Sequence, residues 1–199
     1  MNFLAHAVLS FGVDELLAGN MLSDFIKGKK KDDFPLGIRA GIELHRAIDS
    51  FTDDHPINKE AKRIFMPTYR LYASSVLDIV YDYFVATDDA EWEEKTLENF
   101  SLGVYASLGK FSNYFPPAFS NLFPYMKSEN WLLNYREDMG ILKSLGGLKR
   151  RALYITEVET AFRIFLDEKE FLRNQYNRFF PELKAFALNK ANQWILHNE

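Results

Sequence analysis

Apolar side chains recur at the three- and four-residue spacing of an α-helix along nearly the whole chain, and alternation with a period of two is scarce. In the N-terminal half, the pattern predicts helices over about 2–10, 14–26, 35–52, 57–65 and 67–86. In the C-terminal half, it predicts an amphipathic helix over "DAEWEEKTLENFSLGVYASLGKF", then helices over about 129–144, 149–167 and 168–196. Pro181 is expected to bend or interrupt the last of these helices.

Charged and proline-containing segments separate the predicted helices. "KGKKKDDFP" (27–35) is expected to be a charged loop, and "TDDHP" (52–56) a turn, because a residue before proline is disfavoured in the helical region. The aromatic-rich "NYFPPAFSNLFPYM" is expected to be a broken connector. We find no repeat and no linker, so the sequence predicts one compact all-α domain over residues 1–199, with about seven to ten helices.

Composition narrows the class of protein. Hydrophobic residues make up 47% of the 199 residues, which is enough for a sizeable core. The chain has no cysteine, which excludes disulfides and thiolate zinc sites. The net charge of −4 gives no indication of nucleic-acid binding, and there is no basic leader or apolar run of membrane-spanning length. We therefore expect a cytoplasmic protein that binds neither nucleic acid nor membrane.

Polar side chains continue the apolar faces of several N-terminal helices. Ile38, Ile42, His45 and Asp49 form one stripe of the 35–52 helix, so the histidine and the aspartate should point inward. Asn20 and Asp24 are four residues apart in "LLAGNMLSDFI", and His6 lies within "FLAHAVL". Each has a simpler interpretation: His6 as a hydrogen-bonded core histidine, His45 and Asp49 as a helix-surface pair, and Asp24 as an exposed residue beside Lys27.

Two aspartates in "VLDIVYDYFVA" are harder to explain. Asp78 and Asp82 stand four residues apart on one helix face, where like charges repel, and apolar residues occupy most of the remaining circumference. The face is solvated, or a buried arginine neutralises it, or a divalent cation binds there. Carboxylates and imidazoles without a thiolate favour Mn²⁺, Mg²⁺ or Fe²⁺.

Four motifs resemble a known family in order and spacing. "MNFLAH" at the start, "GNMLSDFIKG" (19–28), "GIELHRAIDSFTDDHP" (41–56) and "VLDIVYDYF" (76–84) are similar to acyl carrier protein phosphodiesterases, also called acyl carrier protein hydrolases. "WLLNYRE" (131–137) is a weaker match. The family is a divergent relative of the HD-type metal phosphohydrolases, so the resemblance implies an HD-like helical fold. It also implies Mn²⁺-dependent hydrolysis of the phosphodiester between 4′-phosphopantetheine and a serine of holo acyl carrier protein.

The resemblance also assigns roles to individual residues. Asp24 matches a required acidic residue, and His6 matches an N-terminal histidine of the family. The metal ligands that it implies are Asp24, His45, Asp49, Asp78 and Asp82. The family often has histidine where this chain has Tyr83. Because a serine leaving group needs a proton, a general acid is expected, and His6 and His55 are its candidates.

Basic residues close to Asp24 suggest where a protein substrate binds. Across residues 27–70, ten Lys or Arg face seven Asp or Glu, a local charge of +3 in a chain of net charge −4. Acyl carrier proteins are strongly acidic, so a basic rim would attract one. The residues expected to bind the substrate are Lys27, Lys29, Lys30, Lys31 and Arg46. A solvated loop without a partner is the simpler interpretation.

Two other functions remain open at this point. An HD-like phosphohydrolase could act on a nucleotide or another small phosphodiester, and a non-catalytic helical module could use these polar residues only to satisfy one another. The aromatic residues of the C-terminal half are most simply core, with a groove for the pantetheine arm as the alternative. They are Phe111, Tyr114, Phe115, Phe119, Phe123 and Tyr125.

Overall fold

The fold was analysed in a computed structural model, which describes residues 1–93 and 95–195. In that part of the chain all regular structure is helical, as predicted. The N-terminal half contains α1 (Phe3–Val8), α2 (Asp14–Leu22), α3 (Leu36–Asp54), α4 (Pro56–Ala61), α5 (Met66–Tyr69) and α6 (Ala73–Ala86). The C-terminal half contains α7 (Leu97–Gly109), α8 (Pro117–Ser128), α9 (Trp131–Asn134), α10 (Asp138–Arg151), α11 (Glu159–Asp167) and α12 (Lys169–Ile195).

The number of helices depends on how the short ones are counted. Among the described residues there are twelve α-helices, of which α1, α4, α5 and α9 have only four to six residues. The eight longer helices fall within the predicted seven to ten. Buried apolar side chains from α1 through α12 form one core cluster. That this makes a single domain over residues 1–199 stays a prediction.

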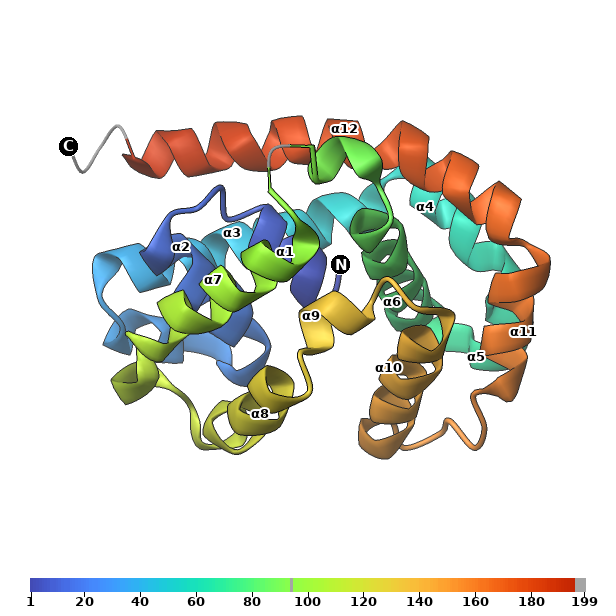
Figure 1. The fold of residues 1–199 in the computed structure, drawn as a ribbon, viewed down its shortest axis with the longest axis horizontal. Coiled ribbons are helices and arrows are strands. Elements are labelled where there is room, and N and C mark those ends of the chain that lie inside the picture. Colours follow the sequence, from blue (N-terminus) through green and yellow to red (C-terminus); the bar gives the residue numbers. More distant parts are fainter. Residues whose placement is uncertain (94, 196–199) are drawn as a thin grey trace.

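The N-terminal helix lies at the centre of the molecule. In Figure 1, α12 runs along one edge, α2, α3 and α7 lie to one side of α1, and α6 and α10 to the other. Leu4, Ala5 and Ala7 of α1 are buried, and α1 contacts both α2 and α6. A short helix is marginal in isolation, so α1 depends on these contacts for its stability. Its position brings residues from both halves of the fold around the first six residues of the chain.

Close packing of α2 on α3 fixes the helix pair that carries most of the predicted site. A Cβ atom on Gly19 would overlap the carbonyl oxygen of Ile38, and one on Gly41 would overlap that of Leu16. Glycine is required at both positions because the two backbones approach each other directly. The amphipathic stripe of α3 then buries Ile38, Ile42 and Ile48 against this contact.

Several predicted boundaries were wrong for local backbone reasons. The predicted helix over 67–86 is divided into α5, a 3₁₀ turn and α6, because Arg70 adopts a left-handed φ of 48°. Residues Gly28–Asp33 of the predicted loop form a 3₁₀ helix. The predicted helix over 89–111 begins only at Leu97, after a 3₁₀ turn at Asp89–Glu91, and residue 94 lies outside the described residues.

Two prolines of the C-terminal half lie inside helices that they do not interrupt. A bend at Pro181, the other predicted outcome, stays a prediction. The predicted broken connector contains α8, which starts at Pro117, where proline is favoured, and continues through Pro124. The α12 helix likewise continues through Pro181, with Phe180 and Leu183 buried on either side. Tertiary packing therefore outweighs the loss of one backbone hydrogen bond at each internal proline. The end of α11 at Asp167 and the start of α12 at Lys169 agree with the prediction, and residue 196 lies outside the described residues. The rest of the predicted helices over 129–144 and 149–167 is divided into α9, α10 and the start of α11.

None of the described helices is both long and apolar enough to cross a membrane.

Candidate metal centre

Three side chains from two helices converge beside the start of the chain. His6 of α1 and His45 and Asp49 of α3 each offer a ligand atom, and these atoms all lie within 4.8 Å of one another. The two imidazole rings are stacked, with centroids 3.9 Å apart and planes at 12°. Asp49 contacts both histidines, with Oδ1 3.2 Å from His6 Nε2 and Oδ2 3.1 Å from His45 Nε2. The predicted inward direction of His45 and Asp49 agrees with this geometry.

Asp24 adds a fourth group on the open side of the cluster. It lies in the 3₁₀ turn Ser23–Phe25, which follows α2 directly, and its Oδ1 is 3.1 Å from His45 Nε2. The side chain is 66% exposed, compared with 40% for Asp49 and 6% for His45. The cluster therefore has a buried imidazole side and a carboxylate side that solvent reaches.

The contact between α2 and α3 also orients His45. Its Nδ1 lies 2.7 Å from the backbone carbonyl oxygen of Asn20. A carbonyl only accepts hydrogen bonds, so Nδ1 carries a proton and donates it. In the neutral ring, Nε2 is then left with a lone pair directed at Asp24 and Asp49. A backbone carbonyl that fixes the ring in this way is a common outer partner of metal-bound histidines.

The pKa values of the two stacked histidines are shifted in opposite directions. Burial lowers the pKa of His45, but its hydrogen bonds with Asp24 and Asp49 outweigh burial and raise that pKa to about 9. Burial and the neighbouring His45 lower the pKa of His6 to about 4. Burial opposes ionisation of Asp49, yet hydrogen bonds from both histidines hold its pKa well below the usual range. Without a metal, a positively charged His45 therefore balances the carboxylates.

The donor set suits a divalent cation. The His6 ring is buried; its Nδ1 lacks a hydrogen-bond partner among the described residues, and its Nε2 lies 3.2 Å from Asp49 Oδ1. Buried polar atoms without a partner are uncommon and costly. Two imidazoles and one or two carboxylates without sulfur are ligands of Mn²⁺, Fe²⁺ or Zn²⁺. A cation bound here would use the free lone pairs and replace the proton on His45 Nε2.

Asp82, by contrast, binds the backbone of α1. Its Oδ2 accepts a hydrogen bond from Leu4 N at 2.7 Å, and its Oδ1 accepts from Asn2 N and Ala5 N at 3.3 and 3.2 Å. These are amides at the start of a helix, which have no partner within the helix. Burial raises the pKa of Asp82 to about 7, although the three N–H donors oppose the shift. A role of Asp82 as a metal ligand stays a prediction.

Asp78 lies one turn away and contacts the amino group of Met1. The nitrogen is 3.0 Å from Asp78 Oδ1 and 3.5 Å from Asp49 Oδ1. Burial raises the pKa of Asp78, and the amino group opposes that shift. No described arginine forms an ion pair with Asp78 or Asp82, so the predicted alternative of a buried arginine finds no support. The amino group and three backbone amides offset the two carboxylates instead.

Comparison with known proteins gives the family. The family model for acyl carrier protein phosphodiesterase matches residues 1–183. The chain belongs to the acyl carrier protein phosphodiesterase family. An acyl carrier protein phosphodiesterase from Enterobacter sp. (strain 638) is 34% identical over 191 residues, which cover 96% of this chain and 99% of that protein. One from Klebsiella pneumoniae subsp. pneumoniae is also 34% identical over 191 residues, with the same coverage.

A relative from Escherichia coli O139:H28, again an acyl carrier protein phosphodiesterase, is 31% identical over 195 residues, covering 96% of this chain and all of that protein. These matches confirm the resemblance inferred from four motifs and the predicted class of enzyme, a phosphoric diester hydrolase. No solved structure matches this chain, so the predicted HD-like character of the fold stays a prediction.

Tyr83, at the position where the resemblance implied a frequent histidine, packs on the side of α6 that faces α11 and α12. Its ring packs on Phe84 and Phe165, and the Lys169 ammonium lies 4.5 Å from the ring centroid. Residues 82 and 83 differ by about 100° around the helix, so they face different neighbours. The departure from the family pattern therefore affects the packing of α6 on α11 and α12.

His55 lies apart from the cluster of His6, His45 and Asp49. It caps the end of α3, ten residues beyond His45, which is about 15 Å at a rise of 1.5 Å per residue. Its Nε2 contacts Glu182 at 3.3 Å, and its ring packs on Phe51 and Phe179. This position does not support the predicted catalytic role of His55, which no observation tests directly.

The predicted substrate-binding cations lie on the surface near Asp24. Lys27, Lys29 and Lys30 are exposed, whereas Lys31 is paired with Glu43. Arg46 is exposed, and its guanidinium donates to the carbonyl of Ile26 at 3.2 Å. Three free lysines and Arg46 thus remain available to a partner, and substrate binding by them stays a prediction.

Sequence reasoning missed the groups that hold the centre together. The Asn20 carbonyl and the amides of α1 are main-chain atoms, which no side-chain pattern marks. Gly19 and Gly41 were visible as two glycines on facing helices, but their role appears only when both helices are placed.

Proposed function

We propose that this protein removes the 4′-phosphopantetheine group from a holo acyl carrier protein by metal-dependent hydrolysis. Family membership supports the phosphodiesterase chemistry and the carrier protein as substrate. The observation that carries the proposal is the cluster of His6, His45 and Asp49, with Asp24 on its open side. It brings imidazole and carboxylate donors together at a solvent-accessible edge.

His6, His45 and Asp49 would hold the divalent cation, with Asp24 completing the set. Mn²⁺ is the first choice, Fe²⁺ also suits imidazole and carboxylate ligands, and Mg²⁺ would bind mainly through the carboxylates. When bound, a divalent cation neutralises charge on the phosphoryl oxygens and lowers the pKa of water. The Asn20 carbonyl keeps His45 Nε2 directed at this position.

The remaining steps belong to residues of this chain. Asp24 is ionised and exposed, so it can orient a water molecule and take up its proton as the water oxygen attacks phosphorus. The bond between phosphorus and the serine oxygen breaks, and that oxygen takes a proton. The products are apo carrier protein and 4′-phosphopantetheine.

Neither predicted general acid is well placed to supply that proton. His6 is 3% exposed and lies beneath His45, and His55 is on another part of the surface. The serine oxygen would lie on the open side, beside Asp24 and Asp49. We propose that solvent on this side protonates it.

The carrier protein would approach from the same side. Lys27, Lys29, Lys30 and Arg46 are exposed close to Asp24 and would attract its acidic surface. Exposed cations mainly increase the rate of association and lose their effect at high salt.

The test is to incubate holo acyl carrier protein with this protein and Mn²⁺ and to follow the intact mass of the carrier protein. We expect loss of the phosphopantetheine mass in wild type, and no loss after chelation or in the Asp49→Asn variant. A carrier protein that keeps its mass while a nucleotide or a small phosphodiester is hydrolysed would replace this proposal with the small-substrate phosphohydrolase. A protein that neither binds Mn²⁺ nor hydrolyses any of these diesters would point to a non-catalytic module.

A further inference from the structure

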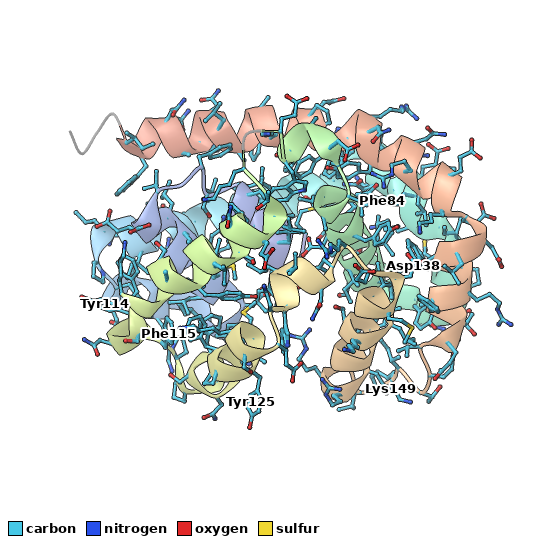
Figure 2. All side chains as sticks on the ribbon, in the orientation of Figure 1. Phe84, Tyr114, Phe115, Tyr125, Asp138 and Lys149 are labelled. Carbon is cyan, nitrogen blue, oxygen red and sulfur yellow. The ribbon has the colours of Figure 1, made fainter. Side chains whose placement is uncertain are left out.

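A cavity of about 640 Å³ lies beside the metal centre, between the start of α1 and helices α8, α9 and α10. Pockets of about 300–1,000 Å³ are typical for small-molecule ligands and cofactors. None of the six aromatic residues proposed for a groove lines it: Phe119 is buried in the core, and Tyr125, labelled in Figure 2, is exposed on α8. Ala118 and Leu122 line it from α8 instead.

The sequence of α10 explains why this space is not filled. Gly140, Lys143, Ser144, Gly147 and Arg151 line the cavity and follow the i, i+3, i+4, i+7, i+11 spacing of one helix face. That face carries no large apolar side chain, so it cannot close against the opposite wall.

The walls combine apolar and hydrogen-bonding groups. Phe3, Phe25 and Trp131 provide aromatic surface, and Asn2 Nδ2 donates to the Tyr135 hydroxyl at 2.8 Å. This mixture suits a ligand that has short aliphatic segments between polar groups.

The cavity adjoins the metal centre directly. Asn2 and Phe3 line both the cavity and the small pocket formed by His6, Asp24 and His45. Phe25, on the cavity wall, follows Asp24 in the chain. A ligand with a phosphate at the metal centre could therefore extend past Phe3 and Phe25 into the cavity.

The outer rim is positively charged. Lys143, Arg150 and Arg151 line the cavity and are exposed, and no carboxylate of the described residues forms an ion pair with them. Glu129 is the acidic residue on the wall, and it accepts a hydrogen bond from Trp131 Nε1. The excess of cations favours a ligand that is part of an anionic substrate.

We infer that this cavity binds the pantetheine arm of the substrate while its phosphodiester lies at the metal centre. The inference rests on the proposed function. The arm carries two amides, a hydroxyl, a dimethyl-substituted carbon and a thiol, which match the mixed walls. The cavity would thereby distinguish a carrier protein with its prosthetic group from other phosphodiesters.

The test fills the cavity without touching the metal centre. A Cβ on Gly147 would lie 3.7 Å from the nearest group, Arg150 Nη2, so a side chain can be added there. The Gly147→Leu side chain would occupy the space of the arm. Gly103→Leu is the matched control, because Gly103 is also a glycine within a helix and its Cβ would lie 3.6 Å from a flexible cation, Lys95 Nζ.

Two measurements separate this inference from the proposed function. The first is binding of free pantetheine, which has no phosphate, to the metal-free protein by saturation-transfer NMR. We expect binding to wild type and Gly103→Leu and none to Gly147→Leu. The second is kcat/KM for holo acyl carrier protein, which should fall at least about tenfold, equivalent to about 1.4 kcal/mol, in Gly147→Leu alone. Each variant's folding is checked by its melting temperature.

The outcomes are distinct. Equal pantetheine binding and equal kcat/KM in both variants would overturn the cavity inference while leaving carrier-protein hydrolysis intact. If the wild-type protein leaves the carrier protein intact, the proposed function is overturned. Binding of pantetheine to wild type and to the two variants is then the remaining test of the cavity inference. Failure of wild type to bind pantetheine at millimolar concentration would reject it.

Discussion

Asp82 and Asp49 look alike in the sequence, as inward aspartates four residues from another polar side chain, but they act on different partners. Asp82 accepts from three amides of α1, whereas Asp49 contacts two imidazoles. The first contact stabilises the fold whether or not a metal is bound. The second would change when a cation replaces the proton on His45.

Asparagine substitutions should separate these two roles. Asp82→Asn places an amide group against backbone donors, and we expect the free energy of unfolding to fall by about 1–3 kcal/mol with or without Mn²⁺. Asp49→Asn should instead abolish the rise in melting temperature that Mn²⁺ produces by binding the folded state. Melting curves with Mn²⁺ and with chelator measure both effects. A metal-dependent loss in Asp82→Asn would make Asp82 a ligand after all.

Tyr83 offers a test of the departure from the family pattern. Because its ring packs on Phe165 and beneath Lys169, we expect Tyr83→His to leave the affinity for Mn²⁺ within about twofold and to destabilise the fold through lost packing and lost cation–π contact. Mn²⁺ titration by calorimetry checks the first part and chemical denaturation the second. A gain in affinity of tenfold or more would show that residue 83 reaches the metal.

For individual residues, helical spacing predicted which side chains point inward but not which groups they contact. The stripe of Ile38, Ile42, His45 and Asp49 placed the last two correctly. The partners of Asp82 and Asp78 are backbone amides and an amino group, and hydrophobic periodicity carries no information about these. Their electrostatic balance could be found only from the structure.

Among the helices, the α2–α3 pair determines the geometry of the centre. Asp24 follows α2, His45 and Asp49 lie on α3, and the Asn20 carbonyl joins the two helices. The distance between the helix axes is set by Gly19 and Gly41. A small increase in this distance would move the carbonyl away from His45 Nδ1.

We expect Gly41→Ala to weaken both the fold and the metal centre. The added Cβ would overlap the Leu16 carbonyl oxygen, and relief of the overlap must separate α2 from α3 at a cost of about 1–3 kcal/mol. Unfolding and Mn²⁺ titrations should both show the loss. Gly109→Ala is the control, because a Cβ there meets nothing within 4 Å, and it should be neutral. Normal Mn²⁺ affinity in Gly41→Ala would show that the glycine contact does not position His45.

Helix boundaries could be predicted where the sequence changes from apolar to polar residues. They could not be predicted where backbone geometry or packing determines the end of a helix. The segment around Pro124 was expected to be a broken connector and the last helix to be bent or interrupted at Pro181, but a helix continues through each proline. Conversely, nothing in the sequence after Pro67 indicated the positive φ at Arg70, which ends α5. Tertiary contacts outweighed the local sequence pattern at the two prolines, and a single dihedral angle outweighed it at Arg70.

For the molecule as a whole, charge is distributed unevenly despite the net value of −4. The free lysines after Asp24 lie on the side from which a carrier protein would approach. The pairing of Lys31 with Glu43 reduces the predicted basic surface by one cation. The sequence could locate this segment, but it could not show which of its lysines are neutralised.

Replacing Lys29 and Lys30 with alanine should therefore slow capture of holo acyl carrier protein. We expect the association rate to fall several-fold at low salt, with little change at high salt, because screening removes the attraction in wild type as well. Stopped-flow or surface-based kinetics across a salt series measure the effect. Lys190→Ala, on α12, serves as the control. An unchanged association rate at low salt would place the carrier protein elsewhere.

The contacts of Asp82 with Asn2, Leu4 and Ala5 join parts of the chain that are 77–80 residues apart in sequence. During synthesis on the ribosome, the segment that carries His6 is made first, but the carboxylate that holds it is made much later. We also expect a contact of such long range to form late in folding, because the chain must lose the entropy of closing a large loop before the contact can stabilise it. We therefore expect the earliest part of the chain to be synthesised to be among the last to become ordered, and the candidate metal centre at His6 to be complete only once α6 has docked.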